Sequence, residues 1–293
     1  MKEIWPNFFI VGTSRSGTSA LYEYLRQHPK VYMPSRKEPY YFCADIVPDD
    51  GGEPPIRSRE EYLRLFNKVK DEIAIGEAST AYLEYPQAAE KIHAVVPHAK
   101  IIIMVRDPIE RALSEYLGRV TIGLEKSSFT EVIARDLAEH RSGKINASNI
   151  ITKSFYCQEV KRYLDVFGKD NVKILIFEEF TQNIMSTVGN VLTFLRINDD
   201  IHSFNEEPVG SYGKPRNTVA NFIMTNKSVR RFASYIVPKE TRQKLGNKYL
   251  LKKEEKPHIS STDRKFLENL YHDDAYNLCI LLNKSLPWPL LKL

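Results

Sequence analysis

The sequence contains few cysteines and no cysteine or histidine spacing typical of a metal site. Its three cysteines, Cys43, Cys157 and Cys279, lie far apart, and none belongs to a C-x-x-C pair. The seven histidines are equally scattered, without an H-E-x-x-H motif. We therefore expect neither a disulfide framework nor a bound metal ion.

Long hydrophobic runs are also missing. No stretch of about 18 apolar residues occurs, so we expect no transmembrane helix. The N-terminus, MKEIWPNFFIVG, enters an apolar run without the charged region, hydrophobic region and cleavage site of a secretory signal. These absences predict a soluble, cytoplasmic protein.

Neither charge sign dominates the chain. The 293 residues include 42 Lys and Arg and 37 Asp and Glu, for a net charge of +5. No helix-turn-helix, zinc-finger or RNP-type motif accompanies this mild excess, so nucleic acid is not an expected partner. Lysine and arginine are denser between Lys214 and Lys265, which favours a small polyanionic ligand.

Short apolar runs alternate with amphipathic segments along most of the chain. This order indicates an α/β fold of three layers, in which helices cover both faces of a central parallel sheet. No repeat or low-complexity tract divides the chain, so we expect a single domain over 1–293 with a helical C-terminal part at about 217–293. The expected strands are 7–12, 72–79, 100–108 and 171–180. Helices are expected to begin at Thr18, Ser58, Pro86 and Asp107, and three further helices are expected at 155–168, 183–197 and 261–282.

The segment between the first strand and the first helix carries most of a phosphate-binding loop. Gly12, Gly17 and Ser19 match G-x-x-x-x-G-K-[ST], but Thr18 replaces the lysine, and the basic residue of the loop is Arg15. Such a loop binds an anion through backbone N–H groups and the N-terminus of the next helix. The missing lysine argues against ATP and magnesium chemistry. From this motif alone, a structural turn is an equally good interpretation.

A second candidate region follows the strand at 100–108. Arg106 ends this strand, and Ser114 lies two turns into the next helix. Ligands of open α/β sheets bind at the carboxyl ends of the strands, so Arg106 and the loop are candidates for one pocket. A structural arginine paired with an aspartate, and a serine on a plain helix surface, are the open alternatives.

Four motifs in order carry a family resemblance: GTSRSGTSAL, KEPYYF, GEASTAYL and VRDPIERALSEYL. They resemble the sulfotransferases that use 3′-phosphoadenosine 5′-phosphosulfate (PAPS), above all the carbohydrate branch that includes the heparan sulfate enzymes. The resemblance extends from about Phe8 to Phe194, and returns weakly at GSYGKPRNTV and at the terminal helix ending in Trp288. It implies a P-loop-containing fold and transfer of a sulfuryl group to a hydroxyl, or as second choice an amine, of a carbohydrate, glycolipid or small molecule, with PAP as product.

The resemblance also implies a set of site residues without a metal. Glu38, in the KE pair, is the expected catalytic base, with Lys37 beside it. Arg15 takes the place of a lysine that contacts the bridging oxygen in the heparan sulfate enzymes. The residues expected to bind the donor are Arg15, Ser16, Gly17, Thr18, Ser19, Arg106 and Ser114, with Lys214 and Arg216 in a loop that closes over it.

The missing lysine then has a chemical explanation, because PAPS has no γ-phosphate. Negative charge gathers on the departing phosphate oxygen, and a nearby cation such as Arg15 stabilises it. An arginine stays protonated at neutral pH, so the expected role of Arg15 is charge stabilisation and not proton donation. Glu38 can accept the proton of the acceptor hydroxyl.

Several alternatives stay open at this point. One is a P-loop nucleotide or small-molecule kinase, and another is a non-catalytic anion-binding protein of the same fold. Glu38 could instead be a surface partner of Lys37 or Arg36. Glu77 is a second candidate acid, or a structural carboxylate that orients basic residues or Thr80. We expect acceptor contacts from the loops 34–56 and 121–152, but the sequence identifies neither the acceptor nor the oligomeric state.

Overall fold

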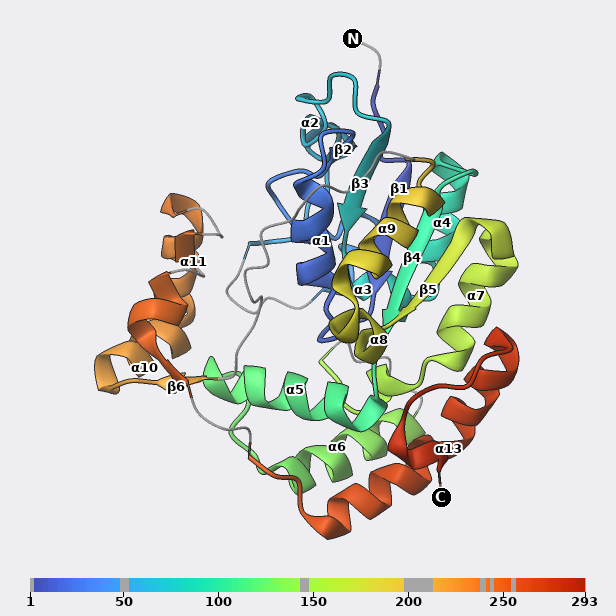
Figure 1. Ribbon diagram of the computed structural model, residues 1–293. Helices are drawn as coiled ribbons and strands as arrows, with labels where there is room; N and C mark the ends of the chain where they lie inside the picture. The colour runs from blue at the N-terminus through green and yellow to red at the C-terminus, as the bar shows by residue number, and fades with distance from the viewer. Residues whose placement is uncertain are drawn as a thin grey trace.

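A five-stranded parallel sheet forms the centre of the molecule (Figure 1). The computed structural model describes residues 3–47, 53–142, 148–197, 213–237, 241–242, 245–253 and 257–292. The predicted three-layer α/β fold is confirmed, with one short edge strand that left no pattern in the sequence. In spatial order the strands are β2 (Val31–Tyr32), β3 (Ala74–Ala78), β1 (Phe8–Gly12), β4 (Lys100–Val105) and β5 (Val172–Ile176).

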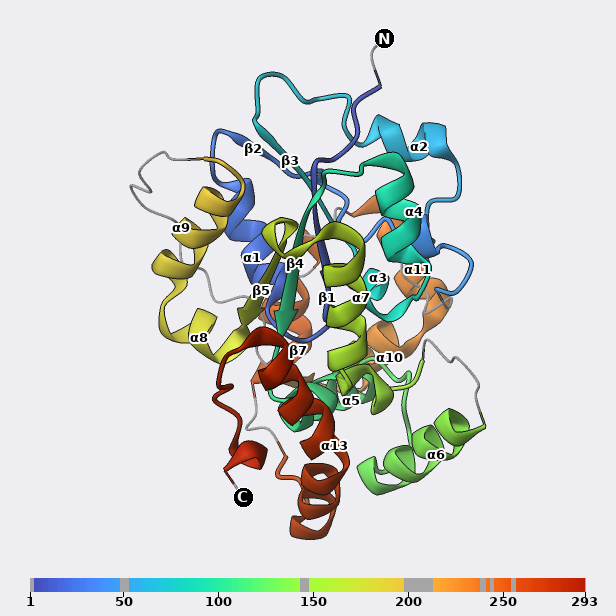
Figure 2. The ribbon, with the colours of Figure 1, turned by 90° about the vertical axis from the view of Figure 1, so that its right-hand side faces the viewer.

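Successive residues of the central strands point to opposite faces of the sheet. Phe8 and Ile10 of β1 belong to one core cluster, and Phe9 and Val11 belong to the other. Because helices cover both faces, every position of β1 is buried, which explains its continuous apolar run. Figure 2 shows the two helical layers. One contains α1 (Thr18–Arg26), α8 (Phe177–Gln182) and α9 (Ile184–Phe194); the other contains α3 (Ala81–Glu84), α4 (Ala88–Val95) and α7 (Cys157–Phe167).

Helix α5 (Pro108–Thr121) crosses beneath the carboxyl ends of the strands (Figure 1). It starts as predicted, because an Asp107 carboxylate oxygen accepts the N–H groups of Ile109 and Glu110 at 2.9 and 3.0 Å. A third core cluster joins α5 to α6 (Phe129–Arg141) and α13 (Ser261–Leu282). Helix α5 therefore lies between the carboxyl end of the sheet and the helices α6 and α13.

Two expectations about secondary structure were wrong. The predicted strand 171–180 ends at Ile176, and Phe177–Gln182 forms α8. There Glu178 accepts the backbone N–H of Asp107 at 3.0 Å, which joins α8 to the start of α5. The predicted loop 121–152 contains α6, whose first turn carries a capping box between Ser128 and Glu131. In the predicted loop 34–56, residues 48–52 lie outside the described residues, and the short helix η1 (Tyr41–Cys43) forms before them.

The C-terminal part is mostly helical, as predicted, and its last helix has the predicted bounds of Ser261–Leu282. It also contains a small antiparallel sheet that was not predicted, β6 (Gly213–Pro215) with β7 (Leu251–Lys253). Among the described residues, no helix is long and apolar enough to cross a membrane. The remaining elements are α2 (Arg59–Arg64), α10 (Thr218–Thr225), α11 (Lys227–Ile236), and the short η2 (Thr152–Ser154), η3 (Lys169–Asn171), η4 (Gly246–Leu250) and η5 (Pro289–Leu291).

Candidate active site

The phosphate-loop sequence forms a tight turn between β1 and α1. Gly17 has a φ of +88°, and a Cβ there would lie 2.9 Å from the Phe177 ring. No side chain caps the N-terminus of α1 in the described structure. The hydroxyl of Ser16 is buried and has no hydrogen-bond partner among the described residues. Free N–H groups and a buried hydroxyl at a helix N-terminus are features of an anion-binding site.

Arg106 contacts this loop directly. Its Nη1 donates a hydrogen bond to the Arg15 carbonyl oxygen at 3.0 Å, and its Cζ lies 4.4 Å from the centre of the Phe177 ring. Its buried Nε has no partner among the described residues. Burial lowers the pKa of Arg106, and the carboxylates of Glu110 and Glu178 oppose this shift. The strand end and the loop thus form one site.

The Glu38 carboxylate lies at the centre of a hydrogen-bond network. Lys37 Nζ donates to Glu38 Oε1 at 3.1 Å and to the Ser19 hydroxyl at 2.9 Å. Tyr40 donates to Glu38 Oε2 at 2.8 Å, and Thr80 donates to Oε1 at 3.3 Å. Lys37 therefore links the predicted base to the first turn of α1.

The backbone around Glu38 adopts a conformation that is rare for residues with a side chain. Glu38 has a φ of +62° and Tyr40 a φ of +57°. Glu38 donates its N–H to the Ala78 carbonyl at 2.9 Å, and Tyr40 donates its N–H to the Ser79 hydroxyl at 3.0 Å. Contacts with the end of β3 thus hold a left-handed loop in place, as is common at functional sites.

Glu77 supports this loop from within the core. It is fully buried, and it accepts hydrogen bonds from Ser79 at 2.6 Å and from Tyr62 at 3.2 Å. Burial raises its pKa to about 7, although the hydroxyl donors oppose the shift. Because Ser79 in turn holds the backbone of Tyr40, Glu77 orients Ser79 and not, as the sequence suggested, Thr80 or basic residues.

The other predicted donor-binding residues lie on α5 and on the small sheet. Ser114 is half-buried on α5. Lys214 pairs with Lys252 in the β6–β7 ladder, and Arg216 donates its Nε to the Leu251 carbonyl at 2.7 Å. In Figure 1, β6 lies beside one end of α5. The structure thus brings together the loop, Glu38, Lys37 and Arg106, and it places Lys214 and Arg216 with a neighbouring element.

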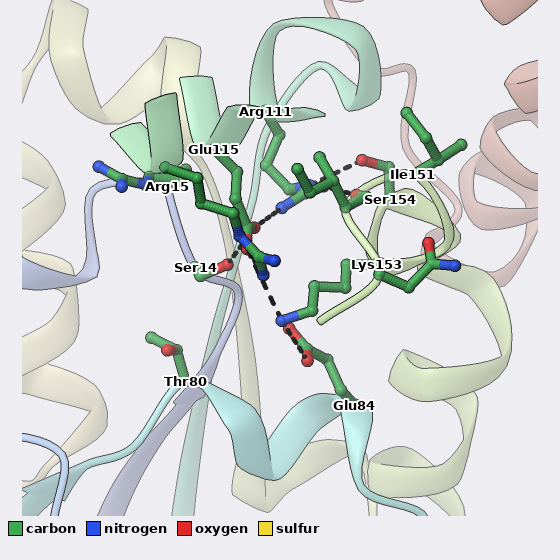
Figure 3. Close-up of polar contacts among 12 residues, drawn as sticks. Ser14, Arg15, Thr80, Glu84, Arg111, Glu115, Ile151, Lys153 and Ser154 are labelled. Carbon is green, nitrogen blue, oxygen red and sulfur yellow. Dashed lines mark hydrogen bonds and ion pairs between the residues drawn. The ribbon is translucent and has the colours of Figure 1, made fainter. Parts of the chain in front are cut away.

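A buried charged cluster next to the loop was not predicted (Figure 3). Glu115, on α5, accepts a hydrogen bond from the Ser14 hydroxyl at 3.0 Å. Arg111 and Arg119 donate to its two oxygens at 2.6 and 2.7 Å, and Lys153 Nζ lies 3.8 Å from Oε1. Although burial raises the pKa of Glu115, these three cations hold it well below its usual range.

The cluster continues away from the loop. Lys153 also pairs with Glu84 at 2.9 Å, and Arg111 Nε donates to the Ser154 hydroxyl at 2.7 Å. The i, i+4 spacing of Arg111, Glu115 and Arg119 was the one available signal in the sequence, because it places the three side chains on one helix face. The contact with Ser14 requires the fold, since 101 positions separate the two residues.

Comparison with known proteins identifies the family. The family model described as "Sulfotransferase domain" matches residues 6–277, nearly the whole chain. The chain belongs to the sulfotransferase family. The predicted resemblance is thereby confirmed, and the kinase alternative finds no support in the comparisons.

Relatives of this chain come from animals, a slime mould and a bacterium. Carbohydrate sulfotransferase 15 of Mus musculus is 26% identical over 245 residues, covering 66% of this chain and 44% of the relative. Heparan sulfate glucosamine 3-O-sulfotransferase 6 of Homo sapiens is 27% identical over 206 residues, covering 68% of this chain and 56% of the relative. The Membrane-associated sulfotransferase kil1 of Dictyostelium discoideum is 38% identical over 111 residues, or 38% of this chain and 22% of that one. The chain thus spans about half or less of the length of these relatives.

A solved structure resembles the whole of this sulfotransferase. The crystal structure of a sulfotransferase from Alicyclobacillus acidocaldarius superimposes with a TM-score of 0.73 at 30% identity, covering 97% of this chain and 98% of that one. The match therefore includes the C-terminal helical part as well as the sheet and the loop.

Proposed function

We propose that this sulfotransferase transfers a sulfuryl group from PAPS to a hydroxyl group, or as second choice an amine, of a carbohydrate, glycolipid or small molecule. The observation that supports this most is the contact between the phosphate loop and Arg106. The loop leads into the uncapped N-terminus of α1, and Lys37 holds Glu38 beside the first turn of that helix. The names of the mouse and human relatives favour a carbohydrate acceptor. The cytoplasmic location and the lack of a metal requirement stay predictions.

The residues present fit a nucleoside donor that carries a phosphosulfate on its 5′-oxygen and a phosphate on its 3′-oxygen. The buried Ser16 hydroxyl and the free N–H groups of α1 can bind the 5′-phosphosulfate, together with Gly17, Thr18 and Ser19. The buried Arg106 Nε, also without a partner among the described residues, can bind the 3′-phosphate with Ser114. Lys214 and Arg216 complete the proposed set from β6 and the residue that follows it.

The chemistry follows from where the charges change. PAPS, when bound, supplies the sulfuryl group and leaves as PAP. Glu38 accepts the proton of the acceptor hydroxyl, while the acceptor oxygen forms its bond to sulfur and the bond between sulfur and the phosphate oxygen breaks. Arg15 stabilises the negative charge left on that phosphate oxygen, and Lys37 holds Glu38 against the start of α1.

A transfer assay with labelled donor tests the proposal. The purified protein is incubated with PAPS carrying a radioactive sulfuryl group and with a panel of glycans, glycolipids and phenols, and PAP binding is measured separately by calorimetry. We expect PAP binding and labelling of at least one acceptor without added magnesium. PAP binding without transfer to any acceptor would favour the non-catalytic interpretation, and absence of both would contradict the proposal.

A further inference from the structure

Helix α5 contacts the phosphate loop at two positions beyond the residues assigned so far. Glu115 accepts the hydroxyl of Ser14, and Gly118, one turn later, lies against the Arg15 side chain. Both contacts involve the part of the loop that carries its cation. They point to a structural reason for where Arg15 sits.

The Glu115 carboxylate is a rigid acceptor. It is 6% exposed, and Arg111 and Arg119 fix its two oxygens from one turn before and one turn after on the same helix. The Ser14 hydroxyl is therefore bound to a group that has little freedom to move. This contact fixes the residue immediately before Arg15.

The backbone of Arg15 is held on its other side by Arg106. Arg15 has a φ of +66°, which is unusual for a residue with a side chain, and its carbonyl accepts the hydrogen bond from Arg106. Ser14 and the Arg15 carbonyl thus restrain the loop from two directions. A left-handed conformation is retained only where such restraints exist.

Gly118 provides the space for the Arg15 side chain. A Cβ at this position would lie 1.9 Å from Nη2 and 2.6 Å from Cζ of Arg15. Both distances are far below van der Waals contact, so any other residue at 118 would push the guanidinium away from α5. The absence of a side chain at Gly118 is therefore what allows Arg15 to lie there.

We propose that Glu115, acting through Ser14, and Gly118, acting by its lack of a side chain, are positioning residues that place the Arg15 guanidinium for sulfuryl transfer. This inference rests on the proposed function, in which Arg15 stabilises the departing phosphate oxygen. Neither residue touches the reacting atoms. A misplacement of about 1 Å in a catalytic group can reduce a rate by about a hundredfold, so the effect of the two residues on turnover is large enough to measure.

Two double-mutant cycles separate this role from a contribution to folding. In the first, kcat and KM for PAPS are measured for Ser14→Ala, Glu115→Leu and the double variant, with the best acceptor from the panel. We expect Ser14→Ala to lower kcat by about tenfold or more. The double variant should match Glu115→Leu, because leucine cannot accept the hydrogen bond and the serine no longer has its partner.

The second cycle combines Gly118→Ala with Arg15→Ala. Gly118→Ala should lower kcat in the wild-type background and leave it unchanged in the Arg15→Ala background, since no guanidinium remains to be displaced. Val120→Ala, at an exposed position of the same helix, is the matched control and should behave as wild type. Additive effects in either cycle, or wild-type kcat for Ser14→Ala, would overturn the inference.

A structural readout keeps the inference independent of the proposed function. Crystal structures of the wild type and of Ser14→Ala and Gly118→Ala, each with PAP, should show the Arg15 guanidinium displaced from α5 in both variants. An unmoved guanidinium overturns the inference even if transfer occurs. A displaced guanidinium in a protein that transfers no sulfuryl group supports the positioning and contradicts the proposed function.

Discussion

At the scale of single residues, Glu38 is held by three donors on a loop that has little freedom. Lys37, Tyr40 and Thr80 fix both carboxylate oxygens. Glu38→Gln preserves the shape of the side chain but removes its ability to accept a proton. We expect kcat to fall by on the order of 10²–10⁴ while PAP binding stays close to that of the wild type.

Steady-state kinetics and calorimetry on the same preparations check this prediction. Glu60→Gln, on the exposed face of α2, is the control for the chemical change. Glu77→Gln is the second comparison, since Glu77 lies in the core behind the loop and should cost less activity than Glu38→Gln. A Glu38→Gln variant that keeps more than about a tenth of the wild-type kcat would remove Glu38 from the mechanism.

Arg106 offers a test of which phosphate binds where. Its side chain already uses Nη1 to hold the loop, and its buried Nε is without a partner among the described residues. Arg106→Ala should weaken binding of PAP by about tenfold or more, since a hydrogen bond to a charged group contributes about 1.5–3 kcal/mol. Binding of adenosine 5′-phosphate, which lacks the 3′-phosphate, should weaken much less. If competition binding shows equal losses of affinity for the two nucleotides, Arg106 acts only by holding the loop. Arg64→Ala, at an exposed position, is the control.

At the residue scale, the sequence identifies side chains that the fold brings together only where the motif is local. The KE pair, the loop and Arg106 each lie within a short sequence motif, and the fold brings them together. Glu115 could not be recognised in this way, because its role depends on a hydroxyl 101 positions away. The same holds for Glu77, whose raised pKa is caused mainly by burial, a property of the whole core.

At the scale of elements, helix starts were predicted better than strand ends. Asp107 and Ser58 cap their helices through their own side chains, a signal that is local in sequence. The end of β5 at Ile176 is different, because apolar residues recur at Phe177 and Phe180 in α8, where Phe180 is also buried. Hydrophobicity alone does not separate a buried strand from the buried face of the next helix.

Glu77, at the end of β3, makes the free energy of unfolding depend on pH. Its pKa of about 7 in the folded protein lies above the ordinary value of 4.5, so the folded state binds the proton more tightly than the unfolded state. Stability therefore falls as the pH rises from about 4.5 to 7, by about 3 kcal/mol in total. Glu77→Gln removes this pH dependence, because glutamine does not ionise.

Urea unfolding at pH 5 and pH 8 measures the effect. We expect the free energy of unfolding of Glu77→Gln, relative to the wild type, to increase between pH 5 and pH 8. Glu60→Gln should show no such change. A constant difference between Glu77→Gln and the wild type at both pH values would mean that the Glu77 carboxyl titrates in the folded protein as it does in the unfolded chain.

At the scale of the whole molecule, charge is unevenly distributed. Residues 213–253 contain eleven Lys and Arg and one acidic residue, Glu240, so the rest of the chain has a net charge of −5. This segment includes β6 and β7, and β6 contacts α5. A small basic region beside the proposed donor site attracts an anion through the solvent before any contact forms.

This distribution predicts that the basic segment accelerates donor binding. The exposed pair Lys248 and Lys252 lies outside the proposed contact residues, so the double change to glutamate should lower the association rate of PAP and leave its dissociation rate nearly unchanged. The difference should shrink as ionic strength rises from about 0.01 M to 1 M, because the screening length falls from about 30 Å to 3 Å. Stopped-flow binding with a fluorescent PAP analogue measures both rates. The control for net charge is the double change of Lys68 and Lys70, two exposed lysines after α2, to glutamate. If the control slows association as much as the pair does, the total charge and not its position governs donor capture. If the dissociation rate rises instead, the two lysines bind the donor directly, and the lid predicted around Lys214 and Arg216 extends to β7.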